Sequence, residues 1–552
     1  MPYKNIDDVP LPPNPAAAPP PDEVIQTDVA IIGSGMGGGA MAYALKDSGA
    51  KVLVIERGHR LPAEPQNSDL DEVYLKGRYK NADTWFNGRT GESFKPGVYY
   101  WVGGNTKVYG ACLPRFRASD FEETRHAEGI SPAWPFSYAD LEPYYTRAEK
   151  LFKVRGQIGE DPTEPSHSEA YPYPALDHEP AIQALADSLR SQGLHPFRMA
   201  NGLDADTPEK RALCATSDGA PNEAGLKSDA EKVAIDPALE AGVALMTGAK
   251  VTRLVLGADG RTVVAALAER GGKLIRIEAA TFILAAGAVN SAALLLRSAT
   301  GEHPRGLANS SGLVGRNYMV HNSTFFIGIN PFKLNRTLWQ KTLGLNDWYE
   351  AGPSNPYPLG NLQMLGKLRA SMLKMARAWV PNPILKAMSD RSIDIYLTTE
   401  DLPRRSNGVS VVDGKIHIWW EPNNLEPHAE LVRRVRRAVR KAGYPVIFTE
   451  RMGIETNSHQ CGTAVAGRDP RTSVLNPDCR AHDLDNLWVV DSSYFPSSAA
   501  LNPALTIAAN ALRVADTILA AGKDAVEVST HGKQSAKSSP DRENLPDPRH
   551  AD

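Results

Sequence analysis

The strongest constraint on the fold is a glycine-rich turn near the N-terminus, which stands between an apolar strand and a helix. Residues 28–32 read Asp-Val-Ala-Ile-Ile and predict a buried parallel strand, and residues 33–38 then read Gly-Ser-Gly-Met-Gly-Gly. A helix is expected over 36–48, followed by a second strand over 51–55 that ends at Glu56. This order of elements is typical of a dinucleotide-binding α/β fold.

Three glycines of this turn have separate physical roles. Gly33 permits the tight turn, Gly35 lets the backbone approach a pyrophosphate, and Gly38 lets the helix pack closely on the strand. The free N–H groups and the partial positive charge of the helix N-terminus suit a phosphate. Glu56 lies roughly 20 residues further on, where a carboxylate can bind a ribose hydroxyl. The motif alone does not distinguish FAD from a nicotinamide cofactor.

Composition is that of a large globular protein and argues against several classes. The chain has 552 residues, of which 42% are hydrophobic and 23% charged, and its net charge is -3. This length allows more than one domain, and the small net charge gives no electrostatic footprint for nucleic acid. We find no secretory signal and no apolar run of membrane-spanning length, so we expect no transmembrane segment. The four scattered cysteines argue against disulfides and metal sites and favour a cytoplasmic location.

Both ends of the chain differ in composition from the rest. Residues 9–22 are rich in proline, and we expect a flexible tail over 1–24. From about Gly522 the sequence is polar and lacks periodicity, so we expect a disordered tail over 523–552. The globular part is therefore expected to span residues 25–522.

A second motif near the C-terminus carries polar side chains that suit acid–base chemistry. Residues 457–463 read Asn-Ser-His-Gln-Cys-Gly-Thr, with His459 at the third position. A neutral imidazole can take a hydroxyl proton near pH 7, which helps a hydride to leave the same alcohol carbon. The side-chain amide of Asn502 can donate to the substrate oxygen and stabilise the charge that develops there.

The segment around Asn502 predicts a strand followed by a helix. Residues 487–490 predict a buried strand that ends at Asp491, at the edge where cofactors lie in open α/β sheets. Asn502 suits the N-cap, and Pro503 suits the first position of a helix that runs to about residue 521. Taken alone, an asparagine in this position is a plain helix cap.

At these residues the chain resembles the glucose–methanol–choline (GMC) oxidoreductases, and the resemblance covers most of residues 25–522. In that family a histidine of a His-x-x-Gly-Thr-like motif and a later His or Asn face the flavin ring, with the spacing of His459 and Asn502. The resemblance implies FAD as cofactor and hydride transfer from a CH–OH carbon to the flavin, with His459 as base. It also implies that the positive end of the helix at Pro503 and Ala504 points at the flavin.

Residues 101–117 resemble a loop of the pyranose-oxidase-like and bacterial glycoside 3-oxidase-like branch, which ends in Pro-Arg-Phe as residues 114–116 do here. The turn formed by Gly103, Gly104 and Asn105 would let the backbone lie against the flavin ring. This branch implies a sugar or glycoside as substrate.

Two positions of the loop depart from the fungal pyranose oxidases. Those enzymes carry a histidine bonded covalently to the flavin where this chain has Val108, so we expect FAD to be held noncovalently. Gly110 stands where they have a threonine, and the choice between an oxidase and a dehydrogenase stays open. The electron acceptor is accordingly oxygen or a quinone- or dye-type molecule.

The remaining segments suggest a second domain. Alternating patterns over 392–401 and 408–422 predict antiparallel strands. We expect an α/β protein (α+β overall), with an FAD-binding domain from 25–115, 205–320 and 456–522. A substrate-binding domain, an antiparallel sheet backed by helices, is expected from 116–204 and 321–455.

Three details of this scheme stay open. Val251 is either an adenine contact or an ordinary core valine. The basic amphipathic stretch 365–380 is a lid, a membrane-surface helix, an oligomer contact or a solvated helix, and the arginine-rich run 433–441 predicts a solvated helix face. The oligomeric state is not predicted.

Three functions remain under consideration. The first is oxidation of a ring secondary hydroxyl, at C2 or C3, of a sugar or glycoside. The second is the same chemistry on a non-sugar alcohol. The third is a relative that uses FAD only structurally, of the hydroxynitrile lyase type.

Overall fold

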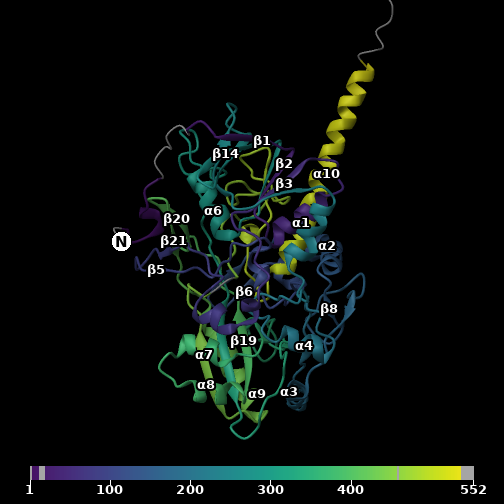
Figure 1. Ribbon diagram of the computed structural model, residues 1–552, viewed down its shortest axis with the longest axis vertical. Coiled ribbons are helices and arrows are strands. Elements are labelled where there is room, and N and C mark those ends of the chain that lie inside the picture. The colour runs from purple at the N-terminus through teal and green to yellow at the C-terminus, as the bar shows by residue number, and fades with distance from the viewer. Residues whose placement is uncertain (1–2, 12–18, 457–458, 536–552) are drawn as a thin grey trace, which may run out of the picture.

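The computed structural model describes residues 3–11, 19–456 and 459–535, which form two connected parts (Figure 1). The upper part in this view is built on a five-stranded sheet with the order β11-β3-β2-β15-β23, and the lower part on a six-stranded sheet with the order β10-β17-β18-β19-β16-β22. The long helix α10 (Ala504–Ser535) leaves the upper part and extends beyond it.

The five-stranded sheet is parallel and buried, as strands covered by helices on both faces must be. Its strands are β2 (Val29–Ile32), β3 (Val52–Ile55), β11 (Ala244–Met246), β15 (Thr281–Leu284) and β23 (Leu487–Val489). The first of these strands in the chain, β2, lies in the middle of the sheet. The chain adds β3 and β11 on one side of it and then β15 and β23 on the other, which is the doubly wound arrangement. The predicted Rossmann-like domain is therefore confirmed.

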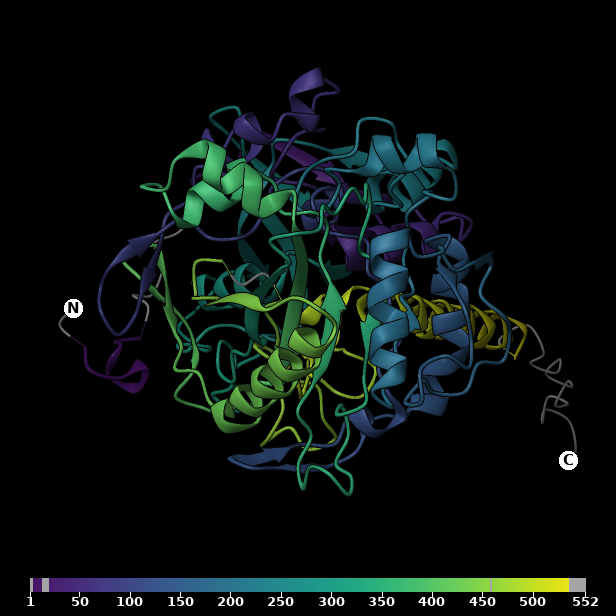
Figure 2. The same cartoon turned by 90° about the horizontal axis from the view of Figure 1, so that it is seen from below.

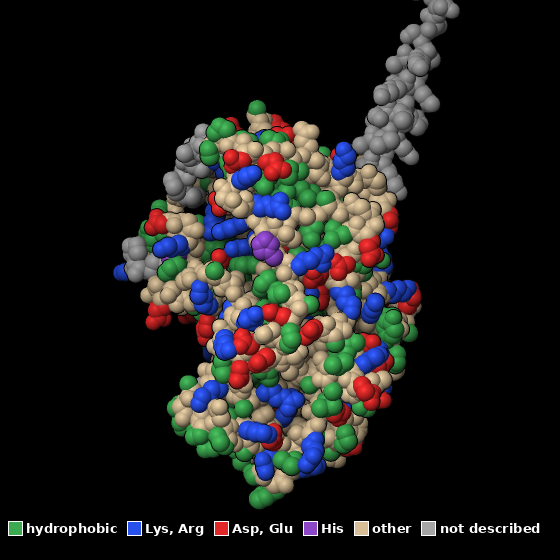
Figure 3. Space-filling model, viewed as in Figure 1, with side chains coloured by type: hydrophobic (Ala, Val, Ile, Leu, Met, Phe, Trp, Pro, Cys, Tyr) green, Lys and Arg blue, Asp and Glu red, His purple; other side chains and the backbone are tan. Residues whose placement is uncertain are grey.

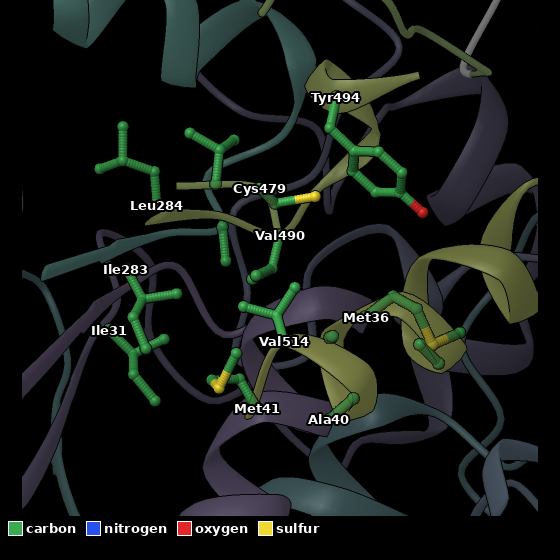
Figure 4. Close-up of a cluster of buried hydrophobic side chains, with 14 of the residues drawn as sticks. Ile31, Met36, Ala40, Met41, Ile283, Leu284, Cys479, Val490, Tyr494 and Val514 are labelled. Atoms are coloured by element: carbon green, nitrogen blue, oxygen red, sulfur yellow. The ribbon is translucent and has the colours of Figure 1, made fainter. Parts of the chain in front are cut away.

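Two helices from opposite ends of the chain pack together against this sheet. Figure 4 shows Met41 of α1 (Met36–Leu45) and Val514 of α10 beside Ile31, Ile283 and Val490, and all five are fully buried. Burying side chains of this size contributes about 2 kcal/mol each to the free energy of unfolding. The contact between α1 and α10 thus joins the two ends of the chain into one core.

Helix α10 differs from expectation in two ways. It runs to Ser535, so the first part of the predicted C-terminal tail is helical, whereas residues 536–552 lie outside the described part. Its segment Ala504–Ala521 is also long and apolar enough to span a membrane, contrary to our finding of no such run. Half of that segment is buried, against α1 and α2 (Tyr138–Leu151), which accounts for its apolar composition.

The N-terminal segment is also more ordered than predicted where it is described. Ile6 is buried, and Asp7 forms an ion pair with Arg316 at 2.8 Å. Strand β1 (Glu23–Gln26) pairs with β14 (Lys273–Glu278) at the edge of a third sheet, which β13 (Val263–Arg270) and β12 (Lys250–Leu256) complete. The proline-rich stretch 12–18 lies outside the described residues.

The six-stranded sheet confirms the predicted antiparallel sheet backed by helices. Helices α3 (Pro180–Ser191) and α9 (Leu425–Lys441) cover one face through an apolar cluster that joins their buried side chains to those of the strands. Figure 2, seen from below, shows both helices toward the viewer. The strands are β10 (Phe197–Arg198), β16 (Asn322–Ile329), β17 (Leu343–Leu345), β18 (Asn361–Met364), β19 (Ser392–Thr399) and β22 (Val446–Arg451).

Two strands assigned to the substrate domain pack elsewhere. β20 (Gly408–Val412) and β21 (Lys415–Trp419) form a separate sheet with β4 (Trp85–Asn87) and β5 (Ser93–Phe94). Their apolar side chains pack on α6 (Ala288–Arg297), which follows β15 of the parallel sheet. A hairpin pattern in the sequence therefore predicted the strands correctly but not the layer that they join.

Charged side chains are intermixed on the face shown in Figure 3. The arginine-rich run of α9 is also mixed with acidic partners, because Arg433 and Arg434 pair with Glu430 at 2.8 and 2.7 Å while Leu431 and Val435 are buried. The prediction of a solvated helix face is thus confirmed for this run.

The stretch 365–380 does not form one long amphipathic helix. It contains α7 (Ala370–Ala376) and is followed by α8 (Asn382–Ser389). Leu368 packs with Tyr396, whereas Trp379 is 81% exposed. The stretch therefore combines a short helix fixed to the sheet with an exposed turn.

Candidate functional site

Two glycine-containing loops meet closely at the N-terminus of α1, and open space remains beside Gly35. A Cβ atom on Gly35 would meet nothing within 4 Å, and one on Gly104 would lie 3.1 Å from the Gly35 Cα. The hydroxyl of Ser34 accepts a hydrogen bond from the Gly103 N–H at 3.1 Å, which ties the loops together. The open space beside a helix N-terminus fits a dinucleotide pyrophosphate.

The other two glycines of the turn are required by close packing. Gly33 has a φ of +106°, and its Cβ would lie 2.4 Å from the carbonyl oxygen of Ala285. A Cβ on Gly38 would lie 1.9 Å from the carbonyl oxygen of Gly33. Both positions therefore need glycine for the fold, whereas Gly35 leaves room for a ligand.

Glu56 lies at the end of β3 and is held against the same turn. Its Oε2 accepts hydrogen bonds from the backbone and hydroxyl of Ser34 at 3.1 and 2.6 Å, and its Oε1 accepts one from Gly58 at 2.8 Å. Ala249 donates its N–H to the Glu56 carbonyl at 3.0 Å, which joins the backbone just before Val251 to the end of β3. Val251 itself is half-buried in β12 (Lys250–Leu256) and packs on the main core.

Asn105 and Asp491 are bonded within the protein. The Asn105 Oδ1 accepts the Tyr99 N–H at 2.8 Å and shapes its own loop. Asp491 is buried, which raises the pKa of its carboxyl group, and it accepts hydrogen bonds from Gly287 at 2.9 Å and from the Ser291 hydroxyl at 2.5 Å. Asp491 therefore joins the end of β23 to the start of α6.

Close packing and a hydrogen bond explain the last two residues of the His-x-x-Gly-Thr segment. Gly462 has a φ of +89°, and a Cβ there would lie 2.3 Å from the carbonyl oxygen of Asn317. The Thr463 hydroxyl donates to the carbonyl of Ala288 at 2.6 Å. These contacts hold the segment that carries His459 between the two parts of the molecule.

His459 contacts a second histidine that the sequence did not indicate. Its Nδ1 lies 3.0 Å from the Nδ1 of His321, and the Nε2 of His321 lies 3.1 Å from the carbonyl oxygen of Ser498. Burial lowers the pKa of His321 to about 4, so its ring is neutral at pH 7 and carries a single proton. A carbonyl only accepts, which puts that proton on the Nε2 of His321.

The tautomer of His459 follows from this contact. Because the Nδ1 of His321 must accept, the Nδ1 of His459 must donate, and its Nε2 then carries the lone pair. Burial lowers the pKa of His459 well below its usual range, and the positive charge of Lys341 lowers it further. The half-buried ring is therefore a neutral base with its basic nitrogen defined.

Asn502 is not the helix cap that we expected. Helix α10 begins at Ala504, with the carbonyl of Pro503 accepting from Ile507 at 3.0 Å. The Asn502 Oδ1 instead accepts a hydrogen bond from the Nε2 of Gln363 at 2.8 Å. A strand side chain thus supplies the donor that a helix N–H would have supplied.

His459 and Asn502 lie against neighbouring side chains of the antiparallel sheet. Gln363 of β18 is directly opposite Tyr396 of β19, and opposed residues share one face. The rings of Tyr396 and His459 are edge to face, with centroids 6.3 Å apart. The two predicted catalytic side chains are therefore gathered on one face of the sheet.

A buried ion pair occupies the space beside Gly110. Lys341 Nζ lies 3.0 Å from Asp218 Oδ2, and a Cβ on Gly110 would lie 2.3 Å from that nitrogen. The absence of a larger residue at this position thus has a steric cause. No local motif identifies Lys341, Asp218, Gln363, Tyr396 or His321, because tertiary contacts alone bring them here.

The buried neutral histidines predict a loss of stability in acid. Burial lowers the pKa of His178, His321 and His428 to about 4 each, below the value near 6.5 of an unfolded chain. As the pH falls below 6.5 the unfolded state gains protons that the folded state does not. The free energy of unfolding should be about 2 kcal/mol lower per histidine at about pH 5 than at pH 7. Urea unfolding of His321→Gln should show a smaller pH dependence, and an unchanged one would contradict the assignment; His195→Gln, an exposed site, is the control.

Alanine should have different effects at a glycine that is tightly packed and at one that faces open space. Gly38→Ala should lower the free energy of unfolding by about 2 kcal/mol, because the added methyl group overlaps the backbone. Gly35→Ala should leave the fold intact but weaken FAD binding, since the methyl group enters the open space. Thermal unfolding with increasing FAD checks this, since added FAD should restore Gly35→Ala but not Gly38→Ala. Equal behaviour of the two variants would refute the distinction.

Comparisons with known proteins identify the family of this chain. Models of the GMC oxidoreductase family match residues 97–323 and 404–511, and a model of the NAD(P)-binding Rossmann-like domain matches residues 31–76. The chain is 32% identical to 6'''-hydroxyparomomycin C oxidase of Streptomyces lividus and 32% identical to paromamine 6'-oxidase of Streptomyces fradiae. Each match covers 89% of this chain and 91% of the relative.

The fold is also shared with solved structures. Pyridoxine 4-oxidase from Mesorbium loti superposes with a TM-score of 0.63 at 19% identity, over 89% of this chain and 98% of that one. With the family models, the relatives and the fold in agreement, this chain belongs to the GMC oxidoreductase family, flavin-dependent enzymes that oxidise CH–OH groups.

Proposed function

We propose that this enzyme oxidises a hydroxyl group of a sugar or glycoside, with His459 as the base and Asn502 as a donor to the substrate oxygen. The observation that carries the proposal is the neutral imidazole of His459, whose Nε2 is left unprotonated by its contact with His321. The two aminoglycoside oxidases among the relatives support the substrate class.

The chemistry assigns one proton and one hydride. Bound FAD would accept the hydride from the alcohol carbon. The Nε2 of His459 would take the hydroxyl proton, and it is available at neutral pH because the pKa of this ring is lowered. The Nδ2 of Asn502 would donate to the same oxygen while negative charge develops on it. Gly33, Gly35, Gly38, Glu56, Gly103 and Gly104 would hold the cofactor, with Asn105, Asp491, Val251, Pro503 and Ala504 in supporting positions.

The proposal has two forms, which differ in the hydroxyl group of the substrate that is oxidised. The branch that the chain resembles favours a ring secondary hydroxyl, at C2 or C3. The names of both relatives instead specify the 6' or 6''' position of an aminoglycoside. Product analysis after incubation with paromamine and with simple glycosides would distinguish them. A flavin that is reduced only by non-sugar alcohols would contradict both, and cyanohydrin cleavage without flavin reduction would favour the lyase alternative.

Several finer points belong to the same proposal. Oxygen or a quinone- or dye-type acceptor would reoxidise the flavin, and a cytoplasmic location suits the four unpaired cysteines of the described residues. No nucleic-acid partner is proposed, in keeping with the small net charge.

Replacing the base should slow the chemical step. In His459→Ala the rate of flavin reduction by substrate should fall by roughly 100-fold or more, while FAD remains bound. Stopped-flow absorbance under anaerobic conditions measures this rate. His195→Ala, in which an exposed histidine is replaced, should react like the wild type. A normal rate in His459→Ala would remove this residue from the mechanism.

The cofactor should be released by denaturation. Val108 is buried and has no nucleophilic atom to bond the flavin. After acid or heat precipitation, the yellow colour should therefore appear in the supernatant. Colour retained by the washed precipitate would show a covalent bond and refute this part of the proposal.

A further inference from the structure

A line of buried polar side chains leads from an ion pair in the protein interior to Asn502. Its inner members are each 6% exposed or less. The line consists of Arg117, Asp161, Asn346, Asn361, Gln363 and Asn502. Five segments of the chain supply these residues, so the line exists only in the folded protein.

Each neighbouring pair in the line is hydrogen-bonded. Arg117 pairs with Asp161, whose Oδ2 accepts from the Nδ2 of Asn346 at 2.7 Å. The Oδ1 of Asn346 accepts from the Nδ2 of Asn361 at 2.8 Å. The Nε2 of Gln363 then donates to the Oδ1 of Asn361 at 3.2 Å and to the Oδ1 of Asn502 at 2.8 Å.

The carboxylate of Asp161 sets the direction of every bond. The two ends of an amide have nearly the same shape, so packing alone does not define its orientation. A carboxylate only accepts, which forces Asn346 to present its Nδ2 to Asp161 and its Oδ1 to Asn361. The same constraint passes to Gln363, whose N–H groups both point at oxygens. It ends at Asn502, whose Oδ1 is occupied.

Both ends of the line support this direction. Burial opposes the charge on Arg117, but the attraction of Asp161 and of the other acidic groups nearby together outweighs it, so the pKa of Arg117 is raised and the guanidinium stays charged. Thr163 donates its N–H and its hydroxyl to the other oxygen of Asp161, both at 2.9 Å. At the far end, the Oε1 of Gln363 is buried without a donor among the described residues. Turning this amide over would break the bonds to Asn361 and Asn502 and would place its oxygen against their Oδ1 atoms, which cannot donate.

We propose that this line of amides fixes the side chain of Asn502 so that its Nδ2, and not its Oδ1, is presented to the substrate oxygen. Gln363 is then a positioning residue. An amide oxygen facing the substrate oxygen would repel the charge that develops there, whereas an N–H group stabilises it. Within the part of the chain that the structure describes, the Nδ2 of Asn502 makes no hydrogen bond to another protein group. The inference rests on the proposed function, because it assumes that Asn502 is a donor in the reaction.

A double-mutant cycle between Gln363 and Asn502 tests the inference. Gln363→Met has a similar length but no hydrogen-bonding group, so the Asn502 amide can then adopt either orientation. The maximal rate of flavin reduction should fall roughly 10-fold, while the substrate KM changes little. In the Asn502→Ala background the same change should have no further effect, because the group that Gln363 positions is already absent. FAD content and the unfolding midpoint are measured for each variant.

Two further variants keep the test decisive. Asn361→Leu removes the acceptor that holds Gln363 and should lower the same rate even if Gln363→Met does not fold. Gln340→Met removes another buried glutamine amide, which binds Asp394 at 2.7 Å outside the line, and should leave the rate unchanged.

The outcomes separate the two proposals. If Asn502→Ala leaves flavin reduction at the wild-type rate, the role of Asn502 in the proposed function is wrong. If Asn502→Ala is slow but Gln363→Met reacts normally, only the positioning inference is overturned. An equal slowing by Gln363→Met in both backgrounds would also overturn it, because a purely structural effect would not depend on Asn502.

Discussion

The hydrogen bond between the two imidazoles of His321 and His459 is the interaction on which the candidate site depends. It leaves the Nε2 of His459 as the basic nitrogen. It forms only when the two parts of the molecule are correctly packed together. His321 precedes β16 of the antiparallel sheet, whereas its own acceptor, the carbonyl of Ser498, lies just before α10. Burial keeps both rings neutral, because an additional proton would put a positive charge in the interior of the protein.

The orientation of the Asn502 amide is set in a similar way, by a buried group that can only accept hydrogen bonds. A carbonyl determines the proton position on His321, and a carboxylate determines the orientation of the amides that end at Asn502. In both cases an acceptor-only group, buried behind the site, orients a side chain that has two possible states. The reactive groups therefore depend on interior polar contacts as much as on their own position in the chain.

The sequence predicted much of the scaffold, because the relevant constraints are local. Gly38, for example, must be glycine because a Cβ atom there would overlap the carbonyl of Gly33, a few residues earlier in the same motif. The predicted assignment of β20 and β21 to the substrate domain was wrong, because alternation identifies a strand but not its layer. The tails were wrong where Ile6 is buried and where α10 continues to Ser535, since low hydrophobicity does not exclude docking or helix formation.

By itself the sequence determined the dinucleotide-binding turn, the antiparallel second part and the residue types that carry the proposed chemistry, His459 and Asn502. Only the tertiary structure decided how these two side chains are presented. Their states are set by His321 and Gln363, which lie far away along the chain and belong to no motif. The physical reason is that a proton position or an amide orientation depends on the partner across the contact, and long-range packing chooses that partner.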